Sequence, residues 1–253
     1  MINTKYVALS RQIALWNQMD TVSNNVANVN TTGFKAEDAI FSEYITDTPK
    51  AKGVASDPVY FTQNFGTYKN FNEGAIVETG NALDLAIDGE GFFAVATQNG
   101  EQYTRKGNFT LNAEGALVTN EGHYVLSTDN KPIIFAPEET DISISGDGSV
   151  YSTQIEAGIS QNNFVANIKL INFENPQELT KTAGTLFEAN ENSNAIASNA
   201  VLKQGAIEKS NVEGVVEMTR LVKLQRSYEY VQQMIDAEHE RLSNTISAYR
   251  QMI

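Results

Sequence analysis

The amino-acid sequence predicts an α+β protein in which long N- and C-terminal α-helices form a coiled-coil-like domain and flank a central all-β domain. Both ends carry apolar residues at helical spacing, whereas the middle alternates apolar and polar residues with the two-residue period of strands. Residues that break helices are concentrated in the middle. All five prolines lie between Pro49 and Pro176, and eleven of the seventeen glycines lie between Gly66 and Gly148.

The N-terminal segment is predicted to be an amphipathic helix over residues 3–32. Its apolar face follows a 4-3-4-3 spacing, and a second apolar stripe is rotated relative to that face. The first face consists of Leu15, Met19, Val22, Val26 and Val29, and the second stripe consists of Tyr6, Leu9, Ile13 and Trp16. We expect the helix to end where Gly33 takes the left-handed conformation and Phe34 folds back onto Val29.

The C-terminal segment is predicted to be a longer helix, from Asn211 to Ile253. Ser210 and Glu213 have the spacing of a capping box, in which each side chain satisfies a free backbone N–H at a helix start. Two rows of residues then alternate by three and four positions to the end of the chain. One row is Leu221, Tyr228, Ile235, Leu242 and Tyr249, and the other is Met218, Gln225, Gln232, His239, Ile246 and Ile253. Polar members of the second row weaken a helix pair but disfavour wrong registers, which suits recognition of a particular neighbour.

The segments between the helices have weaker signals. Residues 35–71 are predicted to be an extended connector, and residues 72–200 are predicted to be the β domain. Within the β domain, Gly91, Gly100, Gly107, Gly115 and Gly122 recur every seven to nine residues, as expected for short strands joined by turns. Residues 205–253 complete the helical domain, of which residues 1–34 form the other part.

The pattern leaves open what covers the two helices. They can pack on each other within one chain, or their apolar stripes can contact other molecules, as exposed apolar stripes often do. Asn24, Asn25 and Asn28 are unusual in a helix because their amides need partners. They predict either a polar ladder between neighbouring subunits or a solvated face that leads to a helix cap.

Composition and motifs argue against catalysis and against several partner classes. A formal net charge of -13 opposes binding to nucleic acid or anionic lipid, and the absence of cysteine excludes disulfides and thiolate ligands. The N-terminus does not resemble a cleaved secretory signal, and no apolar run is long enough for a transmembrane helix. His123 and His239 lack metal-ligand spacing, and Arg105 with Lys106 indicates solvated surface or a subunit contact. We therefore expect no catalytic, cofactor-binding or metal-binding residues.

Four segments of this sequence resemble the signatures of the bacterial flagellar rod and hook proteins. They are residues 23–35 (SNNVANVNTTGFK), 79–93 (TGNALDLAIDGEGFF), 103–109 (YTRKGNF) and 205–212 (GAIEKSNV), which occur in order and span most of the chain. Chain length and residues 65–74 (FGTYKNFNEG) are most similar to the proximal-rod branch of the family. The distal-rod or hook-type branch is the alternative, and an extracytoplasmic ligand-binding module is a more distant one.

The resemblance implies a structural subunit of the flagellar basal-body rod, without cofactors, that polymerises through its terminal helices. Such a subunit would form part of the drive shaft and export channel that transmits torque. It would leave the cell through the flagellar type III export apparatus without a cleaved signal peptide and assemble in the periplasm. Its partners would be copies of itself and other proximal and distal rod proteins, without nucleic acid and without direct membrane insertion. The expected interface residues are Leu15, Met19, Val22, Asn24, Asn25, Val26, Asn28, Val29, Gly33, Phe34, Met218, Leu221, Tyr228, Ile235, Leu242, Ile246 and Tyr249.

Overall fold

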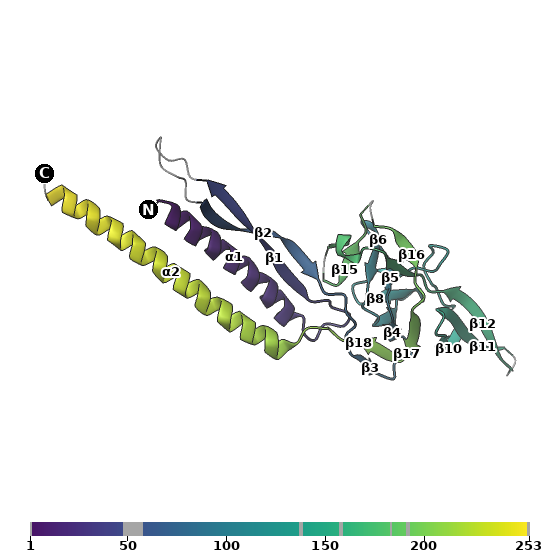
Figure 1. Ribbon diagram of the computed structural model, residues 1–253. Helices are drawn as coiled ribbons and strands as arrows, with labels where there is room; N and C mark the ends of the chain where they lie inside the picture. The colour runs from purple at the N-terminus through teal and green to yellow at the C-terminus, as the bar shows by residue number, and fades with distance from the viewer. Residues whose placement is uncertain are drawn as a thin grey trace. The chain divides into compact units, whose positions relative to one another are not determined.

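The computed structural model of the protein describes residues 2–47, 58–136, 139–156, 159–182, 184–190 and 193–251 (Figure 1). The chain divides into two compact units. A helical unit is built from Met1–Ala27, Glu37–Asn70 and Glu213–Ile253, and a β unit is built from Asn28–Ala36 and Phe71–Val212. The predicted α+β class and the order of helix, β region and helix are confirmed.

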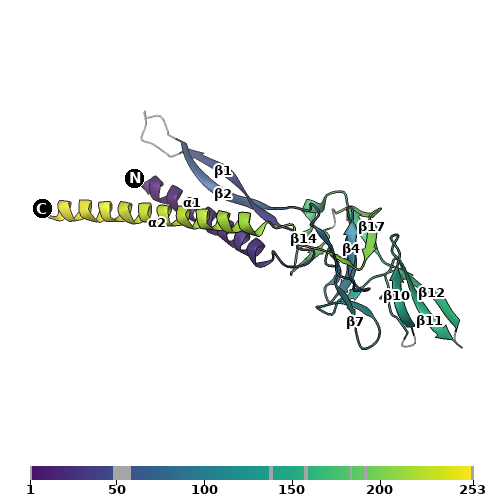
Figure 2. The same ribbon diagram turned by 90° about the horizontal axis from the view of Figure 1, so that it is seen from below.

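Two long helices, α1 (Ile2–Ala27) and α2 (Gly214–Gln251), pack against each other in antiparallel orientation within the helical unit (Figure 1). The buried residues between them are Ala8, Leu15 and Val231, and Leu224, Tyr228 and Ile235 pack around these. Gln232, a predicted polar position of the seam, accepts a hydrogen bond from Gln12 across the pair. In two perpendicular views α2 continues past the N-terminal end of α1, so its last turns have no α1 residues opposite them (Figures 1 and 2).

The N-terminal helix is shorter than predicted, because α1 ends at Ala27 and not near residue 32. Gly33 does take the left-handed conformation, with φ of 67°. It does not cap the helix, however. Residues 28–36 belong to the β unit, where the Gly33 N–H donates a hydrogen bond to the Glu208 carbonyl at 2.8 Å. Partners distant in sequence therefore override the local helix signal.

The C-terminal helix also starts later than predicted, at Gly214 and not at Asn211. The Ser210 hydroxyl accepts a hydrogen bond from the Val212 N–H at 3.2 Å, which forms a tight turn ahead of the helix. The first helical bond runs from Glu217 N–H to the carbonyl of residue 213. The predicted capping box is therefore replaced by a turn followed by the helix.

The predicted connector over residues 35–71 is instead a β-hairpin. Strands β1 (Glu37–Asp47) and β2 (Pro58–Lys69) pair antiparallel over their whole length, with a bulge between Ile40 and Phe41. Both strands contact α1 within the helical unit. Sequence reasoning missed the hairpin because its residues do not alternate cleanly between apolar and polar.

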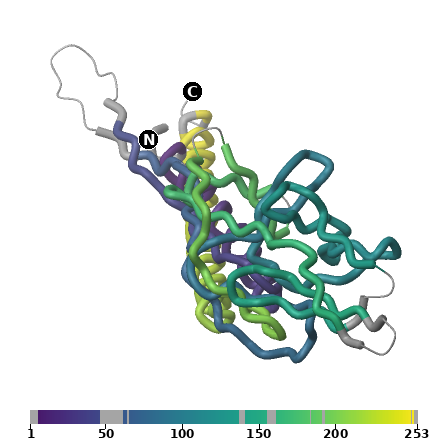
Figure 3. The backbone as a smooth tube through the Cα atoms, turned by 90° about the vertical axis from the view of Figure 1, so that its right-hand side faces the viewer, coloured from purple at the N-terminus to yellow at the C-terminus, as the bar shows by residue number. Residues whose placement is uncertain are grey.

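The β unit consists of short strands, which Figure 3 follows through the teal and green part of the chain. Its strands are β3 (Ile76–Glu78), β4 (Leu85–Asp88), β5 (Phe92–Thr97), β6 (Gly100–Thr104), β7 (Phe109–Leu111), β8 (Leu117–Thr119), β9 (Tyr124–Val125), β10 (Glu139–Ile144), β11 (Ser149–Glu156), β12 (Ile159–Asn167), β13 (Leu170–Phe173), β14 (Thr180–Lys181), β15 (Leu186–Glu188), β16 (Ala195–Ala197), β17 (Val201–Gln204) and β18 (Ala206–Glu208). A short 3-10 helix, η1 (Pro176–Glu178), lies between β13 and β14.

These strands form one large sheet and three smaller ones. The large sheet has the order β14-β15-β6-β5-β9-β8-β7, and β13 joins it beside β5 and carries β16. A three-stranded sheet has the order β10-β11-β12, and two further pairs are β17 with β4 and β18 with β3. Every pairing among these described strands is antiparallel.

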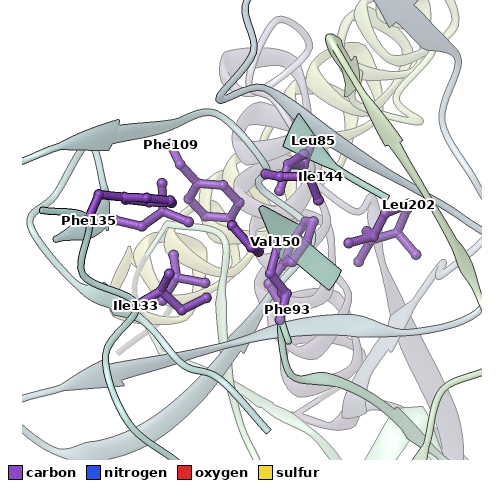
Figure 4. Packing of buried hydrophobic residues seen from close by; sticks show 12 residues of the cluster. Leu85, Phe93, Phe109, Ile133, Phe135, Ile144, Val150 and Leu202 are labelled. Atoms are coloured by element: carbon purple, nitrogen blue, oxygen red, sulfur yellow. The ribbon is translucent and has the colours of Figure 1, made fainter. Parts of the chain in front are cut away.

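Strand β5 separates two hydrophobic clusters because successive side chains of a strand point to opposite faces. Phe93 lies in one cluster and Phe92 in the other. The first cluster joins several strands (Figure 4). It contains Leu85, Ile87, Phe93, Phe109, Leu117, Val125, Ile133, Phe135, Ile144, Val150, Ile168 and Leu202. This core fixes β4, β17 and the three-stranded sheet against the large sheet.

Candidate functional site

The expected interface residues of α1 are largely covered by the chain's own packing. Leu15 and Val22 are each 2% exposed, which leaves them unavailable to a second copy in this conformation. Met19 and Val26 are half-buried in α1, and Val29 is half-buried beyond the end of the helix, in the β unit. The 4-3-4-3 face of the N-terminal helix therefore mainly holds the monomer together.

The expected interface residues of α2 are more open. Met218 is 55% exposed and Ile246 is 64% exposed. Four others, Leu221, Tyr228, Ile235 and Leu242, are half-buried along the same helix. Tyr249 lies in α2, but its side chain lies outside the described residues.

The rotated stripe of α1 is the larger exposed apolar surface on that helix. Tyr6, Leu9, Ile13 and Trp16 are between 47% and 58% exposed and recur every three or four residues. This spacing places all four on one side of the helix. We call them the outer stripe. The stripe was visible in the sequence, but periodicity alone did not show that the other face would be the covered one.

Asn25, and not Asn24, is the buried amide of the helix. It is 1% exposed, its Nδ2 donates to the Glu37 carbonyl at 2.8 Å, and its Oδ1 accepts from the Glu37 N–H at 3.0 Å. Its Nδ2 also lies 3.5 Å from the Glu217 carboxylate. One amide thus joins α1 to the start of β1 and to α2 within one chain. Asn24 is exposed and Asn28 is half-buried, with the Thr31 hydroxyl donating to the Asn28 side chain.

Replacing Asn25 with alanine should lower the free energy of unfolding of the helical unit by about 1–3 kcal/mol, because two backbone groups of Glu37 lose buried partners. The single tryptophan, Trp16, lies on α1, so its fluorescence during urea unfolding reports this unit. The matched control is Asn24→Ala on the exposed side, for which we expect less than about 0.5 kcal/mol. Equal effects of the two substitutions would contradict this role of Asn25.

Residues 28–36, which follow α1, are held in the β unit by residues of the segments 103–109 and 205–212, which also resemble the rod and hook signatures. Besides the Gly33 bond to Glu208, the N–H of Asn211 donates to the Phe34 carbonyl at 3.4 Å. A Cβ on Gly33 would lie 2.4 Å from the backbone of Arg105, so only glycine fits there. Phe34 is 1% exposed, and the Lys181 ammonium lies 4.1 Å from its ring centre. Gly33 and Phe34 are therefore buried parts of the fold.

Three charged side chains meet at this place inside the β unit. The Glu208 carboxylate lies 2.6 Å from Lys35 Nζ through Oε1 and 3.2 Å from Arg105 Nη1 through Oε2. None of the three residues is more than 3% exposed. Backbone groups add three bonds: the Gly74 N–H donates to Glu208, Lys35 Nζ donates to the Asn72 carbonyl, and Arg105 Nη2 donates to the Gly89 carbonyl. Arg105 Nε is buried and has no hydrogen-bond partner among the described residues. We call Lys35, Arg105 and Glu208 the charge cluster.

Burial lowers the pKa of the Lys35 ammonium, and the nearby Arg105 charge lowers it further, whereas Glu208 opposes both effects. The cluster places one lysine, one arginine and one glutamate side chain in a region shielded from water, and the negative charge of Glu73 also acts on Lys35, more weakly than Glu208. The prediction that Arg105 and Lys106 form solvated surface or a subunit contact is wrong for Arg105, which is 3% exposed inside the β unit. Lys106 instead pairs with Glu121 at the edge of the unit.

In the described part of the chain, no group of three or more His, Asp or Glu side chains is arranged to hold a metal ion. Within the same residues, no helix is both long and apolar enough to cross a membrane. His123 lies in the β unit and His239 is exposed on α2.

Comparison with known proteins identifies the family. Residues 6–35 match the family model for flagella basal body rod proteins, and residues 86–152 match the D1 domain model of the flagellar hook proteins FlgE, FlgF and FlgG. Residues 203–248 match the C-terminal model of the flagellar basal body rod proteins FlgE, FlgF and FlgG. The chain is also 38% identical to the flagellar basal-body rod protein FlgF of Caulobacter vibrioides, over 93% of each chain. This chain belongs to the flagellar basal-body rod protein family.

Other members of the rod family show similar coverage. The FlgF of Mesorhizobium japonicum is 35% identical over 90% of each chain, and the FlgG of Bacillus subtilis is 31% identical over 99% of this chain and all of the relative. The rod family predicted from the four sequence segments is therefore confirmed, and the chain is FlgF-like. Membership implies a place in the flagellar basal body and assembly with other rod proteins.

The charge cluster takes one residue from each of the three family-model matches. Lys35 is the last residue of the N-terminal match, Arg105 lies in the D1 match and Glu208 lies in the C-terminal match. The three segments could be recognised in the sequence. The contact between Lys35, Arg105 and Glu208 could not be predicted, because 70 and 103 residues separate the successive members of the cluster. The D1 match lies in the β unit, whereas each of the other two matches spans the point where the chain enters or leaves that unit.

Proposed function

We propose that this protein is a structural subunit of the flagellar basal-body rod, not an enzyme, and that it polymerises through the outer stripe of α1 and the exposed apolar residues of α2. The observation that carries the proposal is the exposure of large apolar side chains on both terminal helices of a rod-family chain. A contiguous exposed stripe such as the outer stripe of α1 marks an interaction surface.

The exposed residues are suited to contacts between copies. Besides the outer stripe, α2 exposes Val215, Val216, Met218, Val222, Tyr230, Met234 and Ile246. Covering the remaining area of one large apolar side chain that is about half exposed stabilises an interface by roughly 1 kcal/mol. Several such contacts repeated along a polymer would make the rod stable although each contact is weak.

The last turns of α2 support the same role. They extend past the start of α1 (Figures 1 and 2). Ile246, close to the end of α2 at Gln251, is 64% exposed. A neighbouring subunit can cover this segment, and the half-buried Leu242 one turn earlier would extend the same contact. Part of the predicted interface, including Met218, Ile246 and Asn24, thus remains available, whereas Leu15, Val22, Asn25, Gly33 and Phe34 serve the monomer.

Within the rod, we place the subunit in the proximal part, in line with its similarity to FlgF proteins; the distal rod is the alternative because FlgG proteins are similar as well. On this proposal the chain passes through the flagellar type III export apparatus without a cleaved signal peptide and assembles in the periplasm. It then forms part of the drive shaft and export channel and transmits torque.

Deletion of the gene in its own bacterium tests the proposal. We expect basal bodies isolated from the deletion strain to lack a complete rod in electron micrographs, and cells to stop swimming until the gene is restored. A restored copy that carries a small epitope should be found on the rod itself by labelling with gold particles. Complete rods in the deletion strain would contradict the proposal and favour a self-contained ligand-binding module.

A further inference from the structure

Members of the charge cluster and their bonding partners lie within about five residues, along the chain, of three of the four points at which the chain leaves or enters the β unit. The division places these points after residues 27, 36, 70 and 212. The first two bound the segment 28–36, which contains Lys35. The third is followed by Phe71 and Asn72, and the fourth is preceded by Asn211 and Val212.

Residues of the β unit tie these segments together. Lys35 Nζ and Asn211 Nδ2 both donate to the carbonyl of Asn72, at 2.7 and 2.9 Å. The Ala36 N–H donates to Asn211 Oδ1 at 2.8 Å. Glu208 then connects Lys35 to Arg105 and to the Gly74 N–H. The side chains of Lys35 and Asn211 thus join three segments that are far apart in the sequence.

The groups that bond to Lys35 would keep other hydrogen-bond partners if Lys35 were removed. Without it, Glu208 would keep Arg105 and the Gly74 N–H, and the Asn72 carbonyl would keep Asn211. Burying two basic side chains that share one directly bonded carboxylate is costly even with Glu73 nearby, and an apolar side chain of similar size is often as stabilising as a buried ion. The bonds of Lys35 are therefore not required for the equilibrium stability of the β unit. They fasten the segment 28–36 to the β unit.

We propose that Lys35, through Glu208 and Asn72, is a mechanical clamp that holds the segment 28–36 in the β unit when force arrives along the chain from α1. This inference rests on the proposed function for the origin of the force, because a rod subunit transmits torque. A short ion pair between two buried side chains must break before the segment can leave, and that rupture sets the lifetime of the attached state under tension.

Pulling single molecules of the full chain tests the clamp. Since the protein has no cysteine, Ser23→Cys and Glu114→Cys provide unique attachment points, on α1 and on an exposed turn of the β unit. At a fixed force, Lys35→Met should shorten the lifetime before the first opening event by about tenfold or more, the equivalent of losing one charged hydrogen bond. The second variant, Asn211→Ala, cuts the other tie to Asn72 and should shorten the same lifetime.

The matched control is Ile133→Val, which removes one methyl group from the core of the same unit, away from the charge cluster. It should lower the urea midpoint at least as much as Lys35→Met but change the opening lifetime less than twofold. An unchanged lifetime in both Lys35→Met and Asn211→Ala, or an equal loss in the control, would overturn the clamp. Because the pulling uses isolated molecules, its failure is separate from the result of the gene deletion.

Discussion

Replacing Glu208 with glutamine should destabilise the β unit by about 3–5 kcal/mol, because the buried side chains of Lys35 and Arg105 lose the carboxylate that bonds to both of them. Glutamine keeps the shape of the side chain and can still accept the Gly74 N–H bond, so the expected loss is mainly electrostatic. Urea unfolding followed by circular dichroism measures the loss. Hydrogen exchange read by mass spectrometry should locate it in residues 71–212 and in the segment 28–36.

Two further variants make this prediction specific. The same change at the exposed Glu213 should cost less than about 0.5 kcal/mol, as surface substitutions usually do. Adding Lys35→Met to Glu208→Gln should recover part of the lost stability, because one buried cation is removed. If Glu208→Gln were as mild as the change at residue 213, the charge cluster would not hold the β unit together. If the double variant were less stable than Glu208→Gln alone, repulsion between the cations would not be the cause.

The sequence predicted the classes of structure well because those depend on local pattern. Helical spacing identified α1 and α2, and the two-residue period with regular glycines identified the β unit. The helix ends were wrong because they depend on distant partners. Residues 28–36 carry a helix-end signature, yet they bond to Glu208 and Asn211, which lie more than 170 residues away in the sequence.

The candidate site shows the same limit at the level of single residues. Leu15 and Trp16 are neighbours in sequence and each belongs to an apolar stripe, but Leu15 is 2% exposed and Trp16 is 58% exposed. Periodicity finds both stripes without stating which one the chain itself covers. Likewise, Asn24 and Asn25 are the same residue type one position apart, and only the pairing with Glu37 distinguishes them.

The covered stripe stabilises the monomer, so the uncovered one should govern assembly, and Trp16→Asp tests this division. The free energy of unfolding of the monomer should fall by only about 1–2 kcal/mol, because Trp16 is 58% exposed and the loss comes from its covered part and from the lower helix propensity of aspartate. Assembly should weaken more than a hundredfold, since the interface loses roughly 2 kcal/mol of apolar burial and must desolvate a carboxylate. Cells that carry the variant should therefore lack complete rods in electron micrographs while the soluble protein stays folded.

Two controls separate the apolar contact from the added charge. Trp16→Phe keeps an aromatic ring and should build rods, whereas Asn99→Asp adds the same charge to an exposed turn of the β unit and should also build rods. Rods at wild-type numbers in Trp16→Asp cells would show that the outer stripe is not an assembly surface. The interface would then rest on α2, whose Met218 and Ile246 remain exposed after α1 has packed. Loss of rods with a folded monomer would instead show that one stripe of α1 serves folding and the other serves assembly.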